Sequence, residues 1–132
     1  MSIGLLLITH DGIGASLLQT MIGMFGGCPL RVENLPIPND SNVAAMKAEA
    51  ARLAASLNNG DGVLVLTDMF GSTPGRIATS LSEEGQVNVL AGVNLPMLVR
   101  IFNYAQLDLQ QITEKALEGG RNCVIACCPI PD

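Results

Sequence analysis

The chain has 132 residues, the size of one domain, and we expect residues 1–132 to fold as a single unit. Apolar residues make up 48% of it and charged residues only 14%, which excludes a disordered chain, and the scarcity of aromatic residues predicts an aliphatic core. The net charge is −5 and no Lys or Arg cluster occurs, so the composition excludes nucleic-acid binding and favours a protein partner with a basic face.

The four cysteines do not form the paired Cys-x-x-Cys pattern of a zinc or redox site. They are Cys28, Cys123, Cys127 and Cys128. Because three of them lie in one apolar run, we interpret them as buried, reduced, structural residues. The N-terminal apolar run is too short for a signal peptide or a membrane span, so we expect a cytoplasmic domain with no direct membrane insertion.

Short apolar runs alternate with amphipathic segments along the chain. The runs are continuous, which is typical of strands buried on both faces, and the segments repeat apolar residues at helical spacing. The predicted elements are a strand at 3–9, a helix at 15–25, a strand at 30–35, a helix ending near 57, a strand at 62–67, a helix from 74 to 81 or 82, a strand at 87–91, helices at 96–104 and 107–117, and a strand at 123–128.

Several residues predict where these elements start and stop. Gly26 and Gly27 are expected to end the first helix, and Pro36 and Pro38 the second strand. Asp40 or Ser41 is expected to cap the second helix, and Thr73, ahead of Pro74, the third. Gly119 and Gly120 are expected to end the last helix. Alternating strands and helices predict an α/β fold with a mainly parallel, doubly wound sheet and helices on both faces. The final strand is expected at an edge, either antiparallel or paired with another subunit.

The single histidine, His10, follows the first predicted strand directly. Ligands of open parallel sheets bind beyond the carboxyl ends of the strands, where the strand order reverses. If the first and third strands are neighbours, His10 faces Asp68 there. An imidazole is a reversible nucleophile near neutral pH, and a carboxylate bonded to one ring nitrogen leaves the other free for attack. A lone histidine is equally consistent with a solvated or structural residue, so both interpretations stay open on these residues alone.

The loop after the third strand predicts a phosphate-binding turn. Gly71, Ser72 and Thr73 lie just ahead of a helix, whose free N–H groups and dipole stabilise an anion, and the two hydroxyls can donate further hydrogen bonds. The alternative is that Thr73 and Pro74 are only a capping pair.

Other chemistries lack their motifs. No Walker loop, dinucleotide-binding fingerprint, G-x-S-x-G elbow or set of zinc ligands occurs, so no metal or organic cofactor is expected. Asp11 either adjusts the pKa of the neighbouring His10 or is an exposed turn residue. Arg76 either steers phosphate or is a solvated helix residue.

Three segments together resemble a known family. T-H-D-G closes the first strand, T-D-M-F-G-S-T-P follows the third, and A-G-V-N-L-P-M-L follows the fourth. In this order they resemble the mannose-type enzyme IIA domain of the bacterial phosphoenolpyruvate-dependent sugar phosphotransferase system, over essentially the whole chain.

The resemblance implies a four-stranded parallel core with an antiparallel C-terminal edge strand exchanged in a homodimer. It implies a phosphotransferase that is phosphorylated on His10, with Asp68 as the orienting carboxylate and Thr73 in contact with the phosphoryl group. The implied donor is the phosphocarrier protein HPr, and the implied acceptor is a IIB domain that phosphorylates a sugar entering through a permease.

Two departures from the family pattern keep alternatives open. The chain has Gly71-Ser72-Thr73 where members often carry two glycines, and Asp132 is not followed by a linker and a IIB domain. The acceptor is then a separate IIB protein, or the chain is a regulatory sensor of phosphorylation state in an incomplete system. A phosphocarrier subunit for dihydroxyacetone kinase is a further alternative, disfavoured by the A-G-V-N-L-P-M-L segment.

Overall fold

The computed structural model describes residues 2–130. Its centre is a sheet of four parallel strands in the order β2-β1-β3-β4. These strands are β1 (Gly4–His10), β2 (Arg31–Ile37), β3 (Val63–Thr67) and β4 (Val87–Ala91). The strand order reverses between β1 and β3, and the two are paired in parallel from Gly4 with Val63 to Ile8 with Thr67. The predicted neighbour relation of the first and third strands is therefore confirmed.

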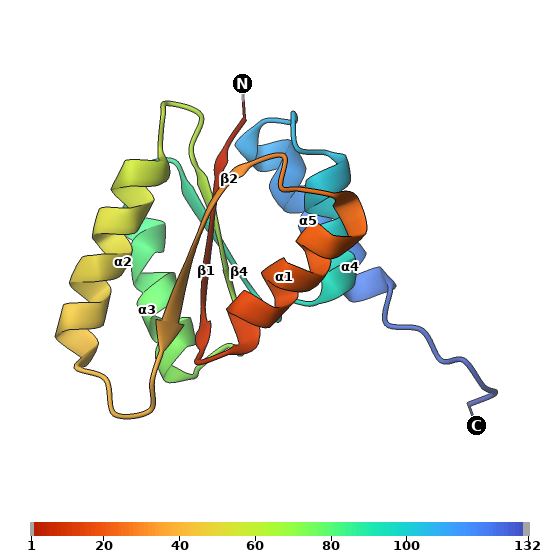
Figure 1. Cartoon of the computed structure of the whole chain (residues 1–132), viewed down its shortest axis with the longest axis horizontal. Coiled ribbons are helices and arrows are strands. Elements are labelled where there is room, and N and C mark those ends of the chain that lie inside the picture. The colour runs from red at the N-terminus through yellow and green to blue at the C-terminus, as the bar shows by residue number, and fades with distance from the viewer. Residues whose placement is uncertain (1, 131–132) are drawn as a thin grey trace.

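Helices cover both faces of the sheet (Figure 1). The helices α1 (Ile13–Phe25), α4 (Leu95–Asn103) and α5 (Leu109–Asn122) pack on one face. The helices α2 (Val43–Leu57) and α3 (Thr73–Ser80), followed by the short 3-10 helix η1 (Leu81–Glu83), pack on the other. Both cores are aliphatic, as the composition predicts. The expected α/β class with a parallel, doubly wound sheet is what the structure shows.

The central strands are buried on both sides. Leu5 and Leu7 of β1 point into the core beneath α1, whereas Leu6 and Ile8 point into the core beneath α2 and α3, and all four are fully buried. Side chains alternate between the two faces of a strand, so a strand with helices on both faces needs a continuous apolar run. This burial makes the frame that holds the strand ends in place.

Several predicted boundaries in the first half of the chain were wrong, among them the start of α1, which lies at Ile13 and not at Ala15. β2 continues through Pro36 to Ile37 instead of ending at residue 35. It is an edge strand, where a residue without an N–H is tolerated. Helix α2 is capped by Asn42, whose side chain accepts a hydrogen bond from the Ala45 N–H, instead of by Asp40 or Ser41.

The last helix differs more from its prediction. α5 runs through Gly119 and Gly120 to Asn122, whereas these glycines were expected to end it. Both are buried against α4, and a Cβ atom on Gly119 would collide with the side chain of Arg100. Glycine is needed here for close helix packing, and its helix-ending tendency is overridden by that packing.

The segment after α5 forms no strand within residues 123–130, so the expected edge strand at 123–128 is not confirmed. It extends away from the domain in Figure 1, with Val124, Ile125 and Ile130 exposed. The prediction of buried cysteines was wrong, because Cys123, Cys127 and Cys128 are exposed and Cys28 is only partly buried.

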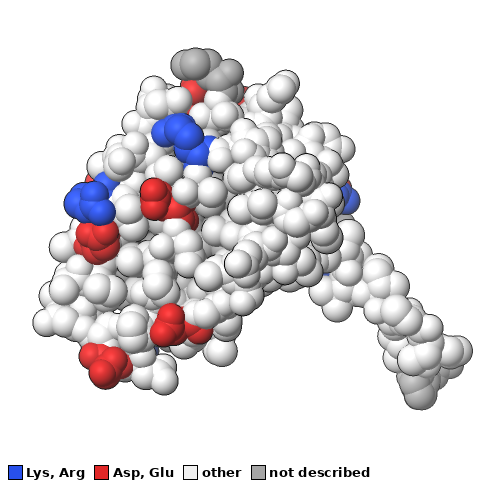
Figure 2. All heavy atoms as spheres, viewed as in Figure 1, with Lys and Arg blue, Asp and Glu red and all other residues white. Residues whose placement is uncertain are grey.

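Charge is unevenly spread over the surface. In Figure 2 the charged side chains gather over the half formed by α2 and β2, and the surface over α1 is uncharged. Helix α1 contains no charged residue and exposes Ile13, Ile22, Met24 and Phe25. No helix among residues 2–130 is long and apolar enough to cross a membrane.

Candidate functional site

The carboxyl ends of β1 and β3 bring His10 and Asp68 together. His10 is the last residue of β1, and Asp68 follows directly after the last residue of β3. Atom Nδ1 of the imidazole lies 2.7 Å from Oδ2 of the carboxylate, although 58 positions separate the two residues in the sequence. The juxtaposition predicted from doubly wound topology is thus present.

The carboxylate of Asp68 is held on both oxygen atoms. Oδ2 also accepts a hydrogen bond from the backbone N–H of His10 at 3.1 Å, and Oδ1 accepts one from the N–H of Met69 at 3.1 Å. The side chain of Asp68 is 10% exposed to solvent, and that of His10 is 36% exposed. The pair therefore combines a fixed, largely covered carboxylate with an imidazole that solvent or a partner can reach.

Hydrogen bonding keeps Asp68 ionised. Burial acts to raise the pKa of this carboxyl group, but the hydrogen bonds from the ring and the backbone N–H of His10 together outweigh burial, and the pKa lies below its ordinary value. An ionised carboxylate can only accept hydrogen bonds. The Nδ1 atom of the neutral imidazole must therefore carry the proton, which leaves a lone pair on Nε2.

The turn ahead of α3 differs from its prediction in one respect. Ser72, and not Thr73, is the N-cap residue: its Oγ accepts the Gly75 N–H at 3.2 Å and donates to the Met69 carbonyl oxygen at 2.6 Å. The Ser72 hydroxyl is thus already used within the fold. Thr73 is exposed, and its hydroxyl forms no hydrogen bond within residues 2–130.

Gly71 has the positive backbone angle that the turn requires, with φ of 84°. The N–H groups of Phe70, Gly71 and Thr73 donate no hydrogen bond to the described part of the protein. Free N–H groups at a helix start attract anions. The capping role predicted for Thr73 was therefore wrong, because Ser72 is the N-cap residue of α3.

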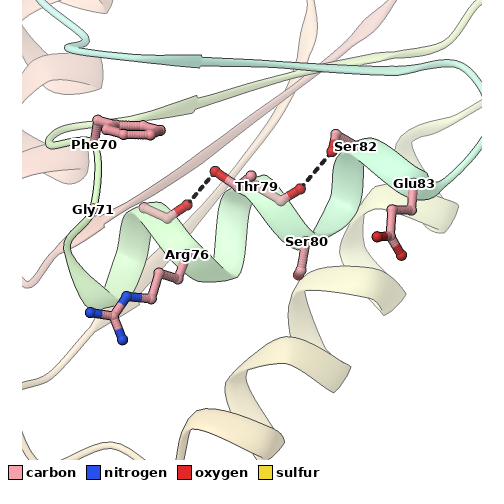
Figure 3. Close-up of a pocket in the computed structure, with 8 residues that line it drawn as sticks. Phe70, Gly71, Arg76, Thr79, Ser80, Ser82 and Glu83 are labelled. Carbon is pink, nitrogen blue, oxygen red and sulfur yellow. Dashed lines mark hydrogen bonds between the residues drawn. The ribbon is translucent and has the colours of Figure 1, made fainter.

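A hollow of about 360 Å³ adjoins this turn, along the outer side of α3 (Figure 3). Phe70 and Arg76 both line it, and in Figure 3 they extend from opposite sides of the start of the helix. Phe70 is 81% exposed, so an apolar ring lies at the surface beside this turn. Arg76 forms no ion pair with any acidic side chain in the described residues.

The loop between β4 and α4 is hydrogen-bonded to the end of β3. The N–H groups of Gly92 and Val93 both donate to the Thr67 carbonyl oxygen at 3.0 Å. Asn94 then caps α4, which begins at Leu95 and not at Pro96 as predicted. This loop supports the strand end that carries Asp68, and it places no titratable side chain beside His10.

Comparisons with known proteins agree with this architecture. Residues 4–117 match the family described as "PTS system fructose IIA component". A curated relative, the PTS system mannose-specific EIIAB component of Escherichia coli K12, is 29% identical over 96% of this chain. The chain spans only 40% of the length of that relative.

Solved structures share the fold. The phosphotransferase system component EIIA from Streptococcus agalactiae superimposes with a TM-score of 0.82 at 19% identity, covering 94% of this chain and 96% of that one. The mannose/sorbose-specific IIA subunit from Enterococcus faecalis also gives a TM-score of 0.82, at 20% identity, covering 100% and 98%. The family match extends over most of the chain, and the protein therefore belongs to the IIA components of the phosphotransferase system.

Proposed function

We propose that this protein is a phosphohistidine carrier, which accepts a phosphoryl group on Nε2 of His10 and passes it to another protein. The observation that carries the proposal is the 2.7 Å contact between Nδ1 of His10 and Oδ2 of Asp68. It fixes the proton on the inner nitrogen and presents the outer nitrogen as the nucleophile.

The transfer needs only the residues of the strand ends. As the Nε2 lone pair forms a bond to phosphorus, the bond between phosphorus and the donor breaks, and the imidazole ring becomes positively charged. The ionised carboxylate of Asp68 stabilises that charge, by the same logic that pairs aspartate with histidine in hydrolase triads. Reversal of these steps delivers the phosphoryl group to the acceptor.

The turn from Gly71 to Thr73 is the proposed site for the phosphoryl oxygens. Its free N–H groups and the exposed Thr73 hydroxyl are the donors, and the start of α3 adds its dipole. The Ser72 hydroxyl is not one of these donors, because it already donates to the Met69 carbonyl oxygen.

We propose HPr as the donor and a IIB protein as the acceptor, in the cytoplasm, with residues 1–132 acting as one IIA domain. The curated relative is named an EIIAB component, which supports a IIB partner. We also propose a homodimer, in which the segment 123–128 of one copy pairs as an antiparallel strand at the sheet edge of the other. The exposed apolar side chains of that segment and the open edge at β4 support this pairing.

Labelling tests the carrier function directly. Incubation with radiolabelled phosphoenolpyruvate, enzyme I and HPr should label the protein with phosphate that is stable to base and labile to acid. The variant His10→Ala should stay unlabelled. Asp11 neighbours His10 and is exposed, so it serves as the matched control, and Asp11→Ala should label normally. Equal labelling of His10→Ala would overturn the site.

The acceptor separates transport from regulation. Incubating the labelled protein with a IIB component should move the label to that component. If the label stays on His10 while the phosphorylated form captures a different protein, the protein is a regulatory sensor, because a phosphoryl group can switch a surface by charge alone.

A further inference from the structure

Helix α1 lacks the local cap that the other α-helices have. In α2, α3, α4 and α5 the N-cap side chain accepts a hydrogen bond from the N–H three residues ahead. The four caps are Asn42, Ser72, Asn94 and Asp108. The N-cap residue of α1 is Gly12, with φ of 91° and no side chain to accept a bond. The turn out of β1 needs this left-handed conformation, which favours glycine and so excludes the usual capping residues.

Thr9 supplies the missing cap from the strand. Its Oγ1 accepts the hydrogen bond of the Gly14 N–H, in the first turn of α1, at 2.9 Å. Thr9 is fully buried and lies on the same face of β1 as Leu5 and Leu7, which pack beneath α1. The hydroxyl is therefore in the core at the one place where the start of α1 needs an acceptor.

The same hydroxyl also holds His10. Its proton is donated to the His10 carbonyl oxygen at 2.8 Å. On the other side of the residue, the His10 N–H is bonded to Oδ2 of Asp68 at 3.1 Å. Both peptide groups that flank the imidazole are thus restrained, one by Asp68 and the other by Thr9.

The start of α1 has no room to relax toward the sheet. A Cβ atom on Gly14 would collide with Oδ1 of Asn34 and lie 3.1 Å from Oγ1 of Thr9. The strand end, the His10 turn and the first turn of α1 are therefore one close-packed unit, with the Thr9 hydroxyl at its centre.

We infer that Thr9 is a positioning residue, whose hydroxyl joins the His10 carbonyl group to the Gly14 N–H and so aims the imidazole at Asp68. A valine at this position would satisfy the packing of a buried strand equally well. What only threonine or serine provides is a group that accepts and donates a hydrogen bond at once. The consequence for phosphoryl transfer rests on the proposed function, whereas the consequence for the ring itself does not.

The test compares Thr9→Val, Thr9→Ser and a matched control, Thr113→Val. The Thr113 hydroxyl likewise donates to a carbonyl, of Leu109 at 2.6 Å, and accepts a hydrogen bond, from Asn88 at 3.1 Å, and it joins α5 to β4 away from His10. If Thr9→Val does not fold, Thr9→Cys takes its place, because a thiol is a weak donor and acceptor of small size.

The first measurement is nitrogen-15 NMR of the unphosphorylated full chain, whose single histidine makes the ring signals unambiguous. The wild-type protein, Thr9→Ser and Thr113→Val should show a protonated Nδ1 and an unprotonated Nε2. In Thr9→Val the two nitrogen signals should move toward each other as the ring exchanges between tautomers. A wild-type ring spectrum in Thr9→Val would overturn the inference, whatever the loss of thermal stability.

The second measurement is the single-turnover rate of His10 phosphorylation, with HPr and with phosphoramidate as donors. Thr9→Val should be slower by about tenfold with both, as expected for a displaced catalytic group, and Thr9→Ser should recover most of the rate. Slowing with HPr alone would assign Thr9 to partner docking and overturn the inference. If the wild-type protein accepts phosphate from neither donor, the proposed function fails, while the NMR comparison still decides the role of Thr9.

Discussion

Helices α1 and α3 both begin at the carboxyl edge of the sheet, after the neighbouring strands β1 and β3, but they are capped in different ways. The cap of α3 is local: Ser72 sits at the N-cap and bonds the Gly75 N–H within the same turn. The cap of α1 comes from Thr9, five residues before the amide that it accepts. The Ser72 hydroxyl reaches back only to the Met69 carbonyl oxygen of its own turn, whereas the cap of α1 encloses His10. We therefore expect helix capping and the position of the imidazole to be separable at α3 and inseparable at α1.

The largest effect is expected at the contact between His10 and Asp68, where the loops after β1 and β3 meet. Replacing Asp68 by Asn puts an amide that can donate a hydrogen bond against Nδ1, which favours the tautomer with its proton on Nε2 and removes the nucleophile. We expect phosphorylation of His10 to slow by about a hundredfold or more, as with the equivalent change in a catalytic triad. Single-turnover labelling measures this rate. A rate within a few-fold of the wild type would show that the reactivity of His10 does not depend on the carboxylate of Asp68.

The two hydroxyls of the turn before α3, of Ser72 and Thr73, should have different effects, one on stability and the other on the transfer rate. Thr73→Val removes an exposed hydroxyl that the fold does not use, so phosphorylation should slow by about tenfold, as for the loss of one hydrogen bond to a charged group, with thermal stability unchanged. Ser72→Ala should lower the free energy of unfolding by about 1 kcal/mol, the usual value of an N-cap, and leave the transfer rate near wild type. Urea unfolding and labelling on the same samples measure both. The reverse pattern would make Ser72 the phosphate ligand.

Glycines near the two helix starts allow a comparison of packing. A Cβ atom on Gly75 would lie 2.5 Å from the backbone oxygen of Met69, which cannot move away, so Gly75→Ala should destabilise the fold by about 2 kcal/mol. The obstacle at Gly14 is chiefly the side-chain end of Asn34, and Gly14→Ala should cost about 1 kcal/mol. Asn34→Ala should abolish the second penalty and leave the first unchanged in a double-mutant cycle. If Asn34→Ala also reduced the cost of Gly75→Ala, the starts of α1 and α3 would be coupled through the sheet.

The smallest effect is a pH dependence of stability from Asp68. Its pKa is below the ordinary value in the folded chain, so the unfolded chain takes up the proton first as the pH falls. The stabilisation is therefore complete above the ordinary carboxyl pKa of about 3.9, and it is lost as the pH falls through that value and below it. Comparing urea unfolding of wild type and Asp68→Asn at pH 7 and pH 3 should show a smaller pH effect in the variant. An equal loss of unfolding free energy between pH 7 and pH 3 in both proteins would mean that the contact of Asp68 with His10 does not stabilise the fold.

Much of the site could be predicted from local patterns. Continuous apolar runs identify buried parallel strands, and the rule for open sheets then assigns His10 and Asp68 to one edge. The proposed phosphate turn, residues 71–73, also follows from its place ahead of a helix, and its role in binding phosphate stays a prediction. None of this depends on side-chain packing, because it uses only the order of the elements and the direction of the strands.

The errors arise where a residue has more than one possible partner. Ser72 and Thr73 are both good caps, and only the backbone geometry selects Ser72. Gly119 and Gly120 signal a helix end, yet their contact with α4 keeps them within α5. Thr9 fits a buried strand as well as valine does, so no pattern in the sequence indicates its two hydrogen bonds. In each case the deciding contact involves geometry that spacing does not encode.

The order of the strands and helices up to α5, the aliphatic core and the placement of His10 and Asp68 at one edge were determined by the sequence alone. These features depend on the periodicity of apolar residues and on the direction of parallel strands. The choice of capping hydroxyl, the path of α5, the exposure of the C-terminal cysteines and the double role of Thr9 were decided only by the tertiary structure. Each of these depends on which atoms come within hydrogen-bonding or van der Waals distance once the chain is packed.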